Sequence, residues 1–163
     1  MARYLFSTFD VTRQVFYTSP LSLAIVNLKP LLPGHILVIP HRVVPRLADL
    51  TPSEISDLFL AVQRVGSTIE KVYEASGLTV SLQDGAVAGQ SVPHVHVHIM
   101  PRKPTDYGGE NDRIYPLIEA SEAGLRNEHL QLRIPKDEER VERDMEVMER
   151  EAQWLAGFFR GGE

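Results

Sequence analysis

The chain has 163 residues, enough for one domain with a substantial hydrophobic core. Its net charge is −5, which disfavours binding to a nucleic acid polymer because such binding needs a basic surface. It has no cysteine, so disulfides, a thiol nucleophile and a cysteine-based zinc site are excluded. The segment Met1–Asp10 lacks a signal pattern and no run approaches 18 apolar residues. We therefore expect a soluble protein with no membrane contact, located in the cytoplasm, with the nucleus as a second compartment.

Short strands rich in Val, Ile and aromatic residues are predicted in the first part of the chain. They are Tyr4–Ser7, Val15–Thr18, Ser22–Asn27 and His35–Ile39. Their links are too short for helical crossovers, which predicts an antiparallel meander. Gly34, in the last link, permits a backbone turn that a larger residue would resist.

A long amphipathic helix is predicted next, from about Pro52 to Ala75. Thr51 is its N-cap, and Glu54 completes a capping box. Apolar residues then recur at steps of three and four, at Ile55, Leu58, Phe59, Val62, Val65, Ile69 and Val72. The helix should therefore cover one face of the sheet, and we expect Gly77 to end it.

Three histidines alternate with apolar residues in the segment His94-Val-His96-Val-His98-Ile. In a β-strand, side chains alternate between faces, so the three imidazoles would line one face and Val95 and Val97 the other. A further strand, Leu78–Asp84, and a loop, Gly85–Val92, precede this histidine ladder. We expect Gln83, Gln90 and Ser91 to converge with the histidines on one polar pocket.

The residues alone leave three interpretations of the ladder open. Histidines at i and i+2 of a strand serve as zinc ligands, although no Asp or Glu shares this face. The rings could instead be satisfied core residues, although burying three ionisable groups is costly. The third interpretation is nucleophilic catalysis, because a neutral imidazole attacks phosphorus well and its neighbours can fix its tautomer.

The chain is predicted to form one α+β domain in three parts. Residues 1–103 would form the catalytic core, and residues 104–135 a flexible loop or linker with a short helix at Arg113–Glu119. Residues 136–163 would add a C-terminal helix, expected over Asp137–Phe159. Trp154 and Phe158 would anchor this helix to the body or to a partner subunit.

The ladder, read on to Met100, resembles the signature of the histidine triad superfamily. Further segments are similar to its fragile-histidine-triad branch: Ser22–Asn27, Lys29-Pro, Pro33-Gly-His35-Ile-Leu-Val, Gln83-Asp-Gly, Gly89-Gln-Ser and Met100-Pro-Arg-Lys103. The resemblance implies an antiparallel five-stranded sheet with the long helix packed on it, extended across a homodimer. It also implies hydrolysis of diadenosine 5′,5′-P1,P3-triphosphate, and of related dinucleoside polyphosphates, to AMP and ADP.

The resemblance implies a role for each residue of the ladder. His96 would attack the α-phosphate and form a covalent AMP-histidine intermediate, which water then hydrolyses. The backbone carbonyl of His94 would hold the other ring nitrogen of His96. His98 would donate hydrogen bonds to the phosphate oxygens, and His35 would support the ladder from behind.

Substrate contacts are implied in the same way. Gln83 would contact the polyphosphate near the scissile bond, and Asn27 would hold the ribose. The phosphate loop would consist of Gly89, Gln90, Ser91 and Val92. Mg²⁺ or another divalent cation would accompany the substrate, with no protein metal site and no tightly bound cofactor.

Two alternative functions stay open. One is the nucleoside phosphoramidase activity of a neighbouring branch, in which the ladder typically runs into Gly-Gly-Arg. Here Met100-Pro-Arg-Lys follows the ladder and Gln83-Asp-Gly precedes it, which favours the polyphosphate hydrolases. The other is a nucleotide-sensing module whose bound complex signals to a partner.

Overall fold

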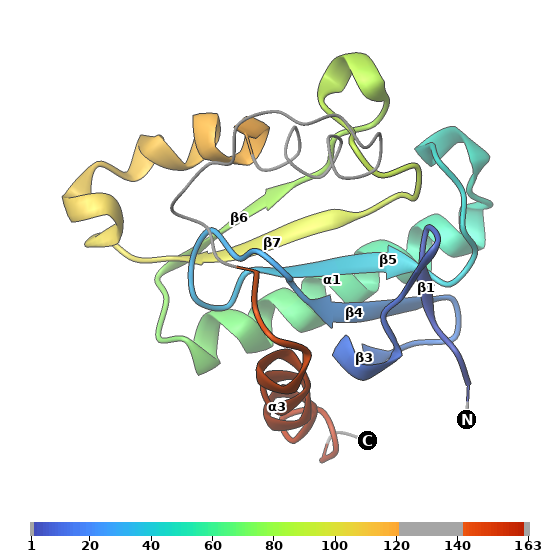
Figure 1. Ribbon diagram of the computed structural model, residues 1–163, viewed down its shortest axis with the longest axis horizontal. Helices are drawn as coiled ribbons and strands as arrows, with labels where there is room; N and C mark the ends of the chain where they lie inside the picture. Colours follow the sequence, from blue (N-terminus) through green and yellow to red (C-terminus); the bar gives the residue numbers. More distant parts are fainter. Residues whose placement is uncertain (1, 121–141, 162–163) are drawn as a thin grey trace.

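A five-stranded antiparallel sheet is the centre of the computed structural model, which describes residues 2–120 and 142–161 (Figure 1). In spatial order its strands are β3 (Val15–Thr18), β4 (Ser22–Val26), β5 (Ile36–Pro40), β7 (Val97–Arg102) and β6 (Gly77–Ser81). Every neighbouring pair is antiparallel. The predicted α+β class and the five-stranded antiparallel sheet are therefore confirmed.

Helix α1 (Pro52–Val72) covers one face of the sheet and lies behind it in Figure 1. Its predicted capping box is formed, because Thr51 Oγ1 accepts from the Glu54 N–H at 3.2 Å and the Glu54 carboxylate accepts from the Thr51 N–H at 2.8 Å. The helix buries one stripe of side chains against alternate strand residues. The stripe and its partners include Leu58, Val62, Val65, Ile69, Val38, Val97 and Ile99.

The end of α1 differs from the prediction. The helix stops at Val72 with Tyr73 as C-cap, and Gly77 begins β6 instead of ending the helix. The reversal is made at Glu74, which adopts a left-handed φ of 53°. The Ser76 N–H then bonds to the carbonyl of Arg102, which starts the pairing with β7.

The predicted apolar stripe of α1 is wider than the surface that the sheet buries. Ile55 and Phe59 remain 38% and 46% exposed. Phe59 follows Ile55 by four residues and Gly66 follows Phe59 by seven, so the three lie on the same side of the helix. Gly66 lies close to Leu78 of β6. This side of α1 therefore runs along the edge strand β6, where Val80 is also exposed.

The opposite face of the sheet carries a second, smaller core. A short hairpin of β1 (Leu5–Phe6) and β2 (Phe9–Asp10) covers it, and Ser7 makes the turn with a φ of 55°. We predicted a strand at the first of these positions but no pairing with the second. This core contains Phe6, Val11, Leu23, Ile25, Leu37, Ile39 and Val92.

Part of the predicted loop or linker, residues 104–135, is regular structure. Short 3-10 turns at Asp106–Gly109 and Asn111–Arg113 lead into a helix over 114–120, near the predicted position. Its residues Ile114 and Ile118 pack on Met100, on the histidine side of β7. Residues 121–135 lie outside the described part of the chain.

The C-terminal helix begins later than predicted. Helix α3 covers Met145–Ala156, and residues 142–144 before it are not helical; residues 137–141 lie outside the described part. Met148, Ala152 and Leu155 are buried beside β3 and β4. Trp154 packs edge-to-face on Tyr73 but stays about half exposed. No helix within residues 2–120 and 142–161 is long and apolar enough to cross a membrane.

Candidate active site

The histidine ladder has the two faces that its sequence predicts. Val95, Val97 and Ile99 belong to the core under α1. His96 and His98 lie on the opposite face, with their ring centroids 5.2 Å apart. Only His98 is within the regular strand, because β7 begins at Val97. All three ladder histidines are at least 98% buried, so their nitrogens need defined partners.

The ring of His94 is held by hydrogen bonds at both nitrogens. Nδ1 accepts from the backbone N–H of Ser7 at 2.9 Å, and Nε2 lies 2.9 Å from the carbonyl of Pro40. A carbonyl only accepts, so the neutral ring carries its hydrogen on Nε2. Phe6 packs against the same ring. The His94 side chain is therefore a structural link between the hairpin, β5 and the ladder.

The His94 backbone fixes the tautomer of His96. His96 Nδ1 lies 2.7 Å from the His94 carbonyl oxygen and must donate to it. The neutral ring therefore has its lone pair on Nε2, which is the nitrogen a nucleophile needs. Phe6 meets the His96 ring edge-on at 5.2 Å and restricts its rotation. The structure thus places the carbonyl contact where the resemblance implied it.

The tautomer of His98 is set by its contact with His35. The Leu31 N–H donates to His35 Nδ1 at 3.0 Å, so neutral His35 carries its hydrogen on Nε2. That nitrogen lies 2.9 Å from His98 Nδ1 and donates to it. His98 must then carry its hydrogen on Nε2, away from His35. The pair therefore presents an N–H donor beside the lone pair of His96.

The loop after β6 follows Ser81, which is paired with His98 of the ladder in the sheet. Gln83 has a buried side-chain oxygen with no hydrogen-bond partner in the described structure. A Cβ at Gly89 would stand 3.7 Å from Gln83 Cγ, and Gly89 has a φ of +93°, which favours glycine. Ser91 is buried as well, while the Val92 side chain belongs to the core under the hairpin.

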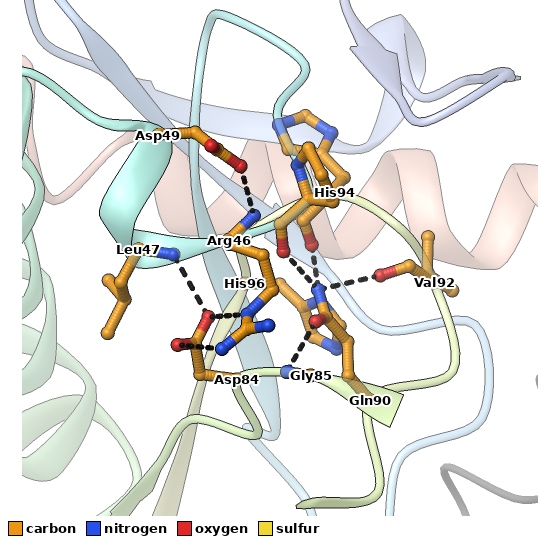
Figure 2. Close-up of polar contacts among 10 residues, drawn as sticks. Arg46, Leu47, Asp49, Asp84, Gly85, Gln90, Val92, His94 and His96 are labelled. Atoms are coloured by element: carbon orange, nitrogen blue, oxygen red, sulfur yellow. Dashed lines mark hydrogen bonds and ion pairs between the residues drawn. The ribbon is translucent and has the colours of Figure 1, made fainter. Parts of the chain in front are cut away.

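The Gln90 side chain is bonded within the loop, and the implied contact of Gln90 with phosphate stays a prediction. Its Oε1 accepts from the Gly85 N–H at 2.8 Å, and its Nε2 donates to the carbonyls of Pro45 and Val92 at 2.7 and 3.1 Å. Figure 2 shows this amide between the two ends of the loop. Its side chain therefore shapes the loop from within.

An ion pair that the sequence did not indicate supports the same loop. Arg46 and Asp84 form two hydrogen bonds, at 3.1 and 3.3 Å, and Asp84 also accepts from the Leu47 N–H at 2.9 Å (Figure 2). The arginine holds the pKa of the Asp84 carboxyl below its usual range. Asp84 follows Gln83 directly, so this pair fixes the chain next to the unpartnered amide oxygen.

Asn27 stands at the end of β4, next to His35. Its Oδ1 accepts from the Lys29 N–H at 2.9 Å, and its Nδ2 lies 3.2 Å from His35 Nε2. The residue is 9% exposed. The structure therefore places Asn27 beside the histidine pair, and its contact with a ribose stays a prediction.

The zinc interpretation of the ladder has no support in this geometry. His94 uses both ring nitrogens within the protein, and His96 and His98 each use Nδ1. Within residues 2–120 and 142–161, no group of three or more His, Cys, Asp or Glu side chains is placed to hold a metal ion.

Known proteins are similar to this chain in sequence and in fold. A model of the HIT domain matches residues 8–105, more than half of the chain. The chain belongs to the HIT family. Among HIT relatives, an asymmetrical bis(5′-nucleosyl)-tetraphosphatase from Schizosaccharomyces pombe is 52% identical over 94% of this chain and 93% of its own length. A bifunctional bis(5′-adenosyl)-triphosphatase/adenylylsulfatase from Arabidopsis thaliana is 46% identical over 96% of this chain and 84% of its own.

A solved HIT-type structure agrees with the fold over nearly the whole chain. The diadenosine triphosphate hydrolase of Plasmodium falciparum superposes with a TM-score of 0.74 at 29% identity, covering 98% of this chain and 85% of that one. The sheet and helices that position the ladder here are therefore those of a HIT enzyme.

The burial of His94 predicts a pH-dependent stability. Burial lowers the pKa of His94 to about 4 from an ordinary value of 6.5, because the charged ring loses its hydration. Between these values the unfolded chain binds more protons, so stability is full above pH 6.5 and falls as the pH drops toward 4. The loss is roughly 3 kcal/mol, at about 1.4 kcal/mol per pH unit. Urea unfolding of the wild type and of His94→Gln across this range measures it, and equal pH slopes in the two proteins would contradict it.

Proposed function

We propose that the protein hydrolyses dinucleoside polyphosphates asymmetrically, with diadenosine triphosphate cleaved to AMP and ADP. The observation that carries this proposal is the 2.7 Å contact between His96 Nδ1 and the His94 carbonyl. It leaves the Nε2 lone pair as a nucleophile, next to the N–H donor of His98. The names of the two relatives, a tetraphosphatase and a triphosphatase of dinucleoside substrates, support the substrate class.

The proposed reaction has two displacement steps. His96 Nε2 attacks the α-phosphorus, forming a P–N bond as the P–O bond to ADP breaks, and ADP leaves as an anion that needs little protonation. Water then attacks the same phosphorus and forms a P–O bond as the P–N bond breaks, which releases AMP, gives one proton to the solvent and restores neutral His96. In both steps His98 Nε2–H donates to a phosphate oxygen and stabilises the charge that develops there.

The contacts to the rest of the substrate extend this proposal. The unpartnered oxygen of Gln83 would bind near the scissile bond, where it could accept a hydrogen bond from the attacking water. Gly89, Gln90, Ser91 and Val92 would line the phosphates, and Asn27 would hold the ribose. Mg²⁺ would enter with the polyphosphate and reduce its charge, held mainly by the phosphate oxygens.

The relatives differ in the number of phosphates in the substrate for which they are named. The relative at 52% identity is named for tetraphosphates, and the one at 46% for triphosphates. Both substrates give AMP by the same attack on the α-phosphorus, with ADP or ATP as the leaving group. We therefore propose cleavage of the triphosphate and of related dinucleoside polyphosphates.

Product analysis after incubation with diadenosine triphosphate and Mg²⁺ tests the proposal. Equal amounts of AMP and ADP are expected. Cleavage of an adenosine phosphoramidate in place of the triphosphate would assign the protein to the phosphoramidase alternative. Nucleotide release that is slower than bond cleavage would support a sensing role for the bound complex.

A homodimer completes the proposal for the assembly. An exposed apolar surface lies where α1 runs along the edge strand β6, and it consists of Ile55, Phe59 and Val80. A second copy of the chain would cover this surface. Light scattering should give twice the chain mass of 18.3 kDa. A monomer at micromolar concentration would refute the dimer.

The cytoplasmic or nuclear location stays a prediction, which imaging of a fluorescent fusion protein tests.

A further inference from the structure

Arg143 ties the segment before α3 to the end of β4. Its guanidinium donates twice to the backbone carbonyl of Asn27, through Nε at 3.1 Å and through Nη2, and its backbone N–H donates to the carbonyl of Leu28 at 3.2 Å. Nη1 pairs with Glu151 on α3, which also accepts from the Tyr73 hydroxyl at 2.9 Å. The Arg143 and Glu151 side chains are 20% and 16% exposed, so water screens the pair only weakly.

Asn27, the residue that Arg143 holds, lies against the histidine pair. Arg143 fixes its backbone carbonyl and the Lys29 N–H fixes its Oδ1, so the remaining amide nitrogen is directed at His35 Nε2, 3.2 Å away. Both nitrogens carry hydrogen in the tautomer derived above. The amide of Asn27 therefore restrains the position of the His35 ring by direct contact.

We propose that Arg143 is a positioning residue for His98, acting through Asn27 and His35. An arginine suits this position because its rigid fork of donors reaches the Asn27 carbonyl twice and Glu151 at the same time. Without it, the Asn27 carbonyl would lose both of its side-chain donors and the Glu151 carboxylate would keep only the Tyr73 hydroxyl, and the end of β4 would shift to rehydrate the carbonyl. His35 and then the His98 donor would move with it.

The proposal predicts a specific kinetic change. The positioning role of Arg143 rests on the proposed function, in which His98 stabilises the transition state. Arg143→Ala should therefore lower kcat, while KM for diadenosine triphosphate stays within about twofold. A decrease in kcat of about 10- to 100-fold is expected from a small misplacement of a catalytic group. Arg143→Lys, which keeps the charge and one bond, should recover part of the loss.

Arg13, in the 3-10 turn Thr12–Gln14, offers a matched control because it contacts the same helix. It donates to Glu149 of α3 through Nε at 3.0 Å and so also attaches α3 to the body, but its contacts do not include Asn27. Arg13→Ala should therefore leave kcat unchanged. An equal decrease in kcat for Arg13→Ala and Arg143→Ala would show that only the docking of α3 matters and would overturn the proposal.

Nitrogen-15 NMR of the histidine rings separates this proposal from the proposed function. In the substrate-free wild type, His98 should carry its hydrogen on Nε2; in Arg143→Ala a mixture of tautomers is expected, whether or not the protein cleaves the substrate. Unchanged ring signals with unchanged kcat, or a rise in KM alone, would overturn it. If Arg143→Ala does not fold, Arg143→Met combined with Glu151→Gln leaves no unpaired buried charge and carries the same test.

Discussion

His96→Asn is expected to lower kcat by several orders of magnitude while nucleotide affinity stays nearly the same. Asparagine fits the space of the imidazole, and its amide nitrogen can still donate to the His94 carbonyl that now binds Nδ1. Its amide nitrogen is not nucleophilic, because its lone pair is delocalised into the carbonyl, so only the transition state loses a bond. Turnover of diadenosine triphosphate gives kcat, and calorimetry with a non-hydrolysable analogue gives the affinity.

His41→Asn is the control for this prediction. His41 lies outside the ladder, where its Nε2 donates to the carbonyl of Ser19 at 3.0 Å, so its replacement should leave kcat unchanged. Rapid denaturation during turnover adds a direct test, because labelled AMP should remain attached to the wild type but not to His96→Asn. Retained turnover in His96→Asn would end the covalent model.

Gly34→Ala is expected to destabilise the protein strongly. Gly34 has a φ of +83°, and a Cβ there would stand 2.7 Å from Pro101 Cγ and 2.8 Å from Tyr73 Cδ2. The left-handed backbone costs alanine about 1 kcal/mol, and the overpacking adds about 1–3 kcal/mol. Urea unfolding should show the sum. Because His35 follows directly, kcat should also fall.

Gly77→Ala provides the matched comparison. Gly77 lies at the start of β6, and nothing stands within 4 Å of the position of its Cβ. Its replacement should change the unfolding free energy by no more than about 0.5 kcal/mol. Equal losses in the two variants would mean that the close contact at Gly34 relaxes at little cost, contrary to the prediction.

Local patterns predicted most of the fold. The apolar spacing and the Thr51 capping box located α1, and alternation located the strands, because these signals depend on residues within a few positions of each other. The end of α1 was missed, since Glu74 supplies the left-handed turn that glycine usually makes. Residues 142–144 were predicted to be helical and are not, because Arg143 takes a tertiary contact with Asn27 in place of a helical one.

The candidate site could be predicted only where a motif holds its residues together. The ladder and the family resemblance gave His96 and the His94 carbonyl, and the structure places them in contact. The Ser7 N–H on His94 and the Arg46 pair of Asp84 join residues 87 and 38 positions apart, for which the sequence carries no local signal. Gln90 shows the converse limit, because a residue within a motif can serve the loop itself.

The hairpin over the ladder sets when the site can form during synthesis. Its Ser7 contact waits for His94, 87 residues later, and the Arg143 contact with Asn27 spans 116 residues. When only the first strands and α1 have left the ribosome, the residues that Ser7 and Asn27 will contact have not yet emerged, so the site cannot form. Domains fold as units once their sequence has emerged, so the nascent chain should gain activity in one late step and not gradually.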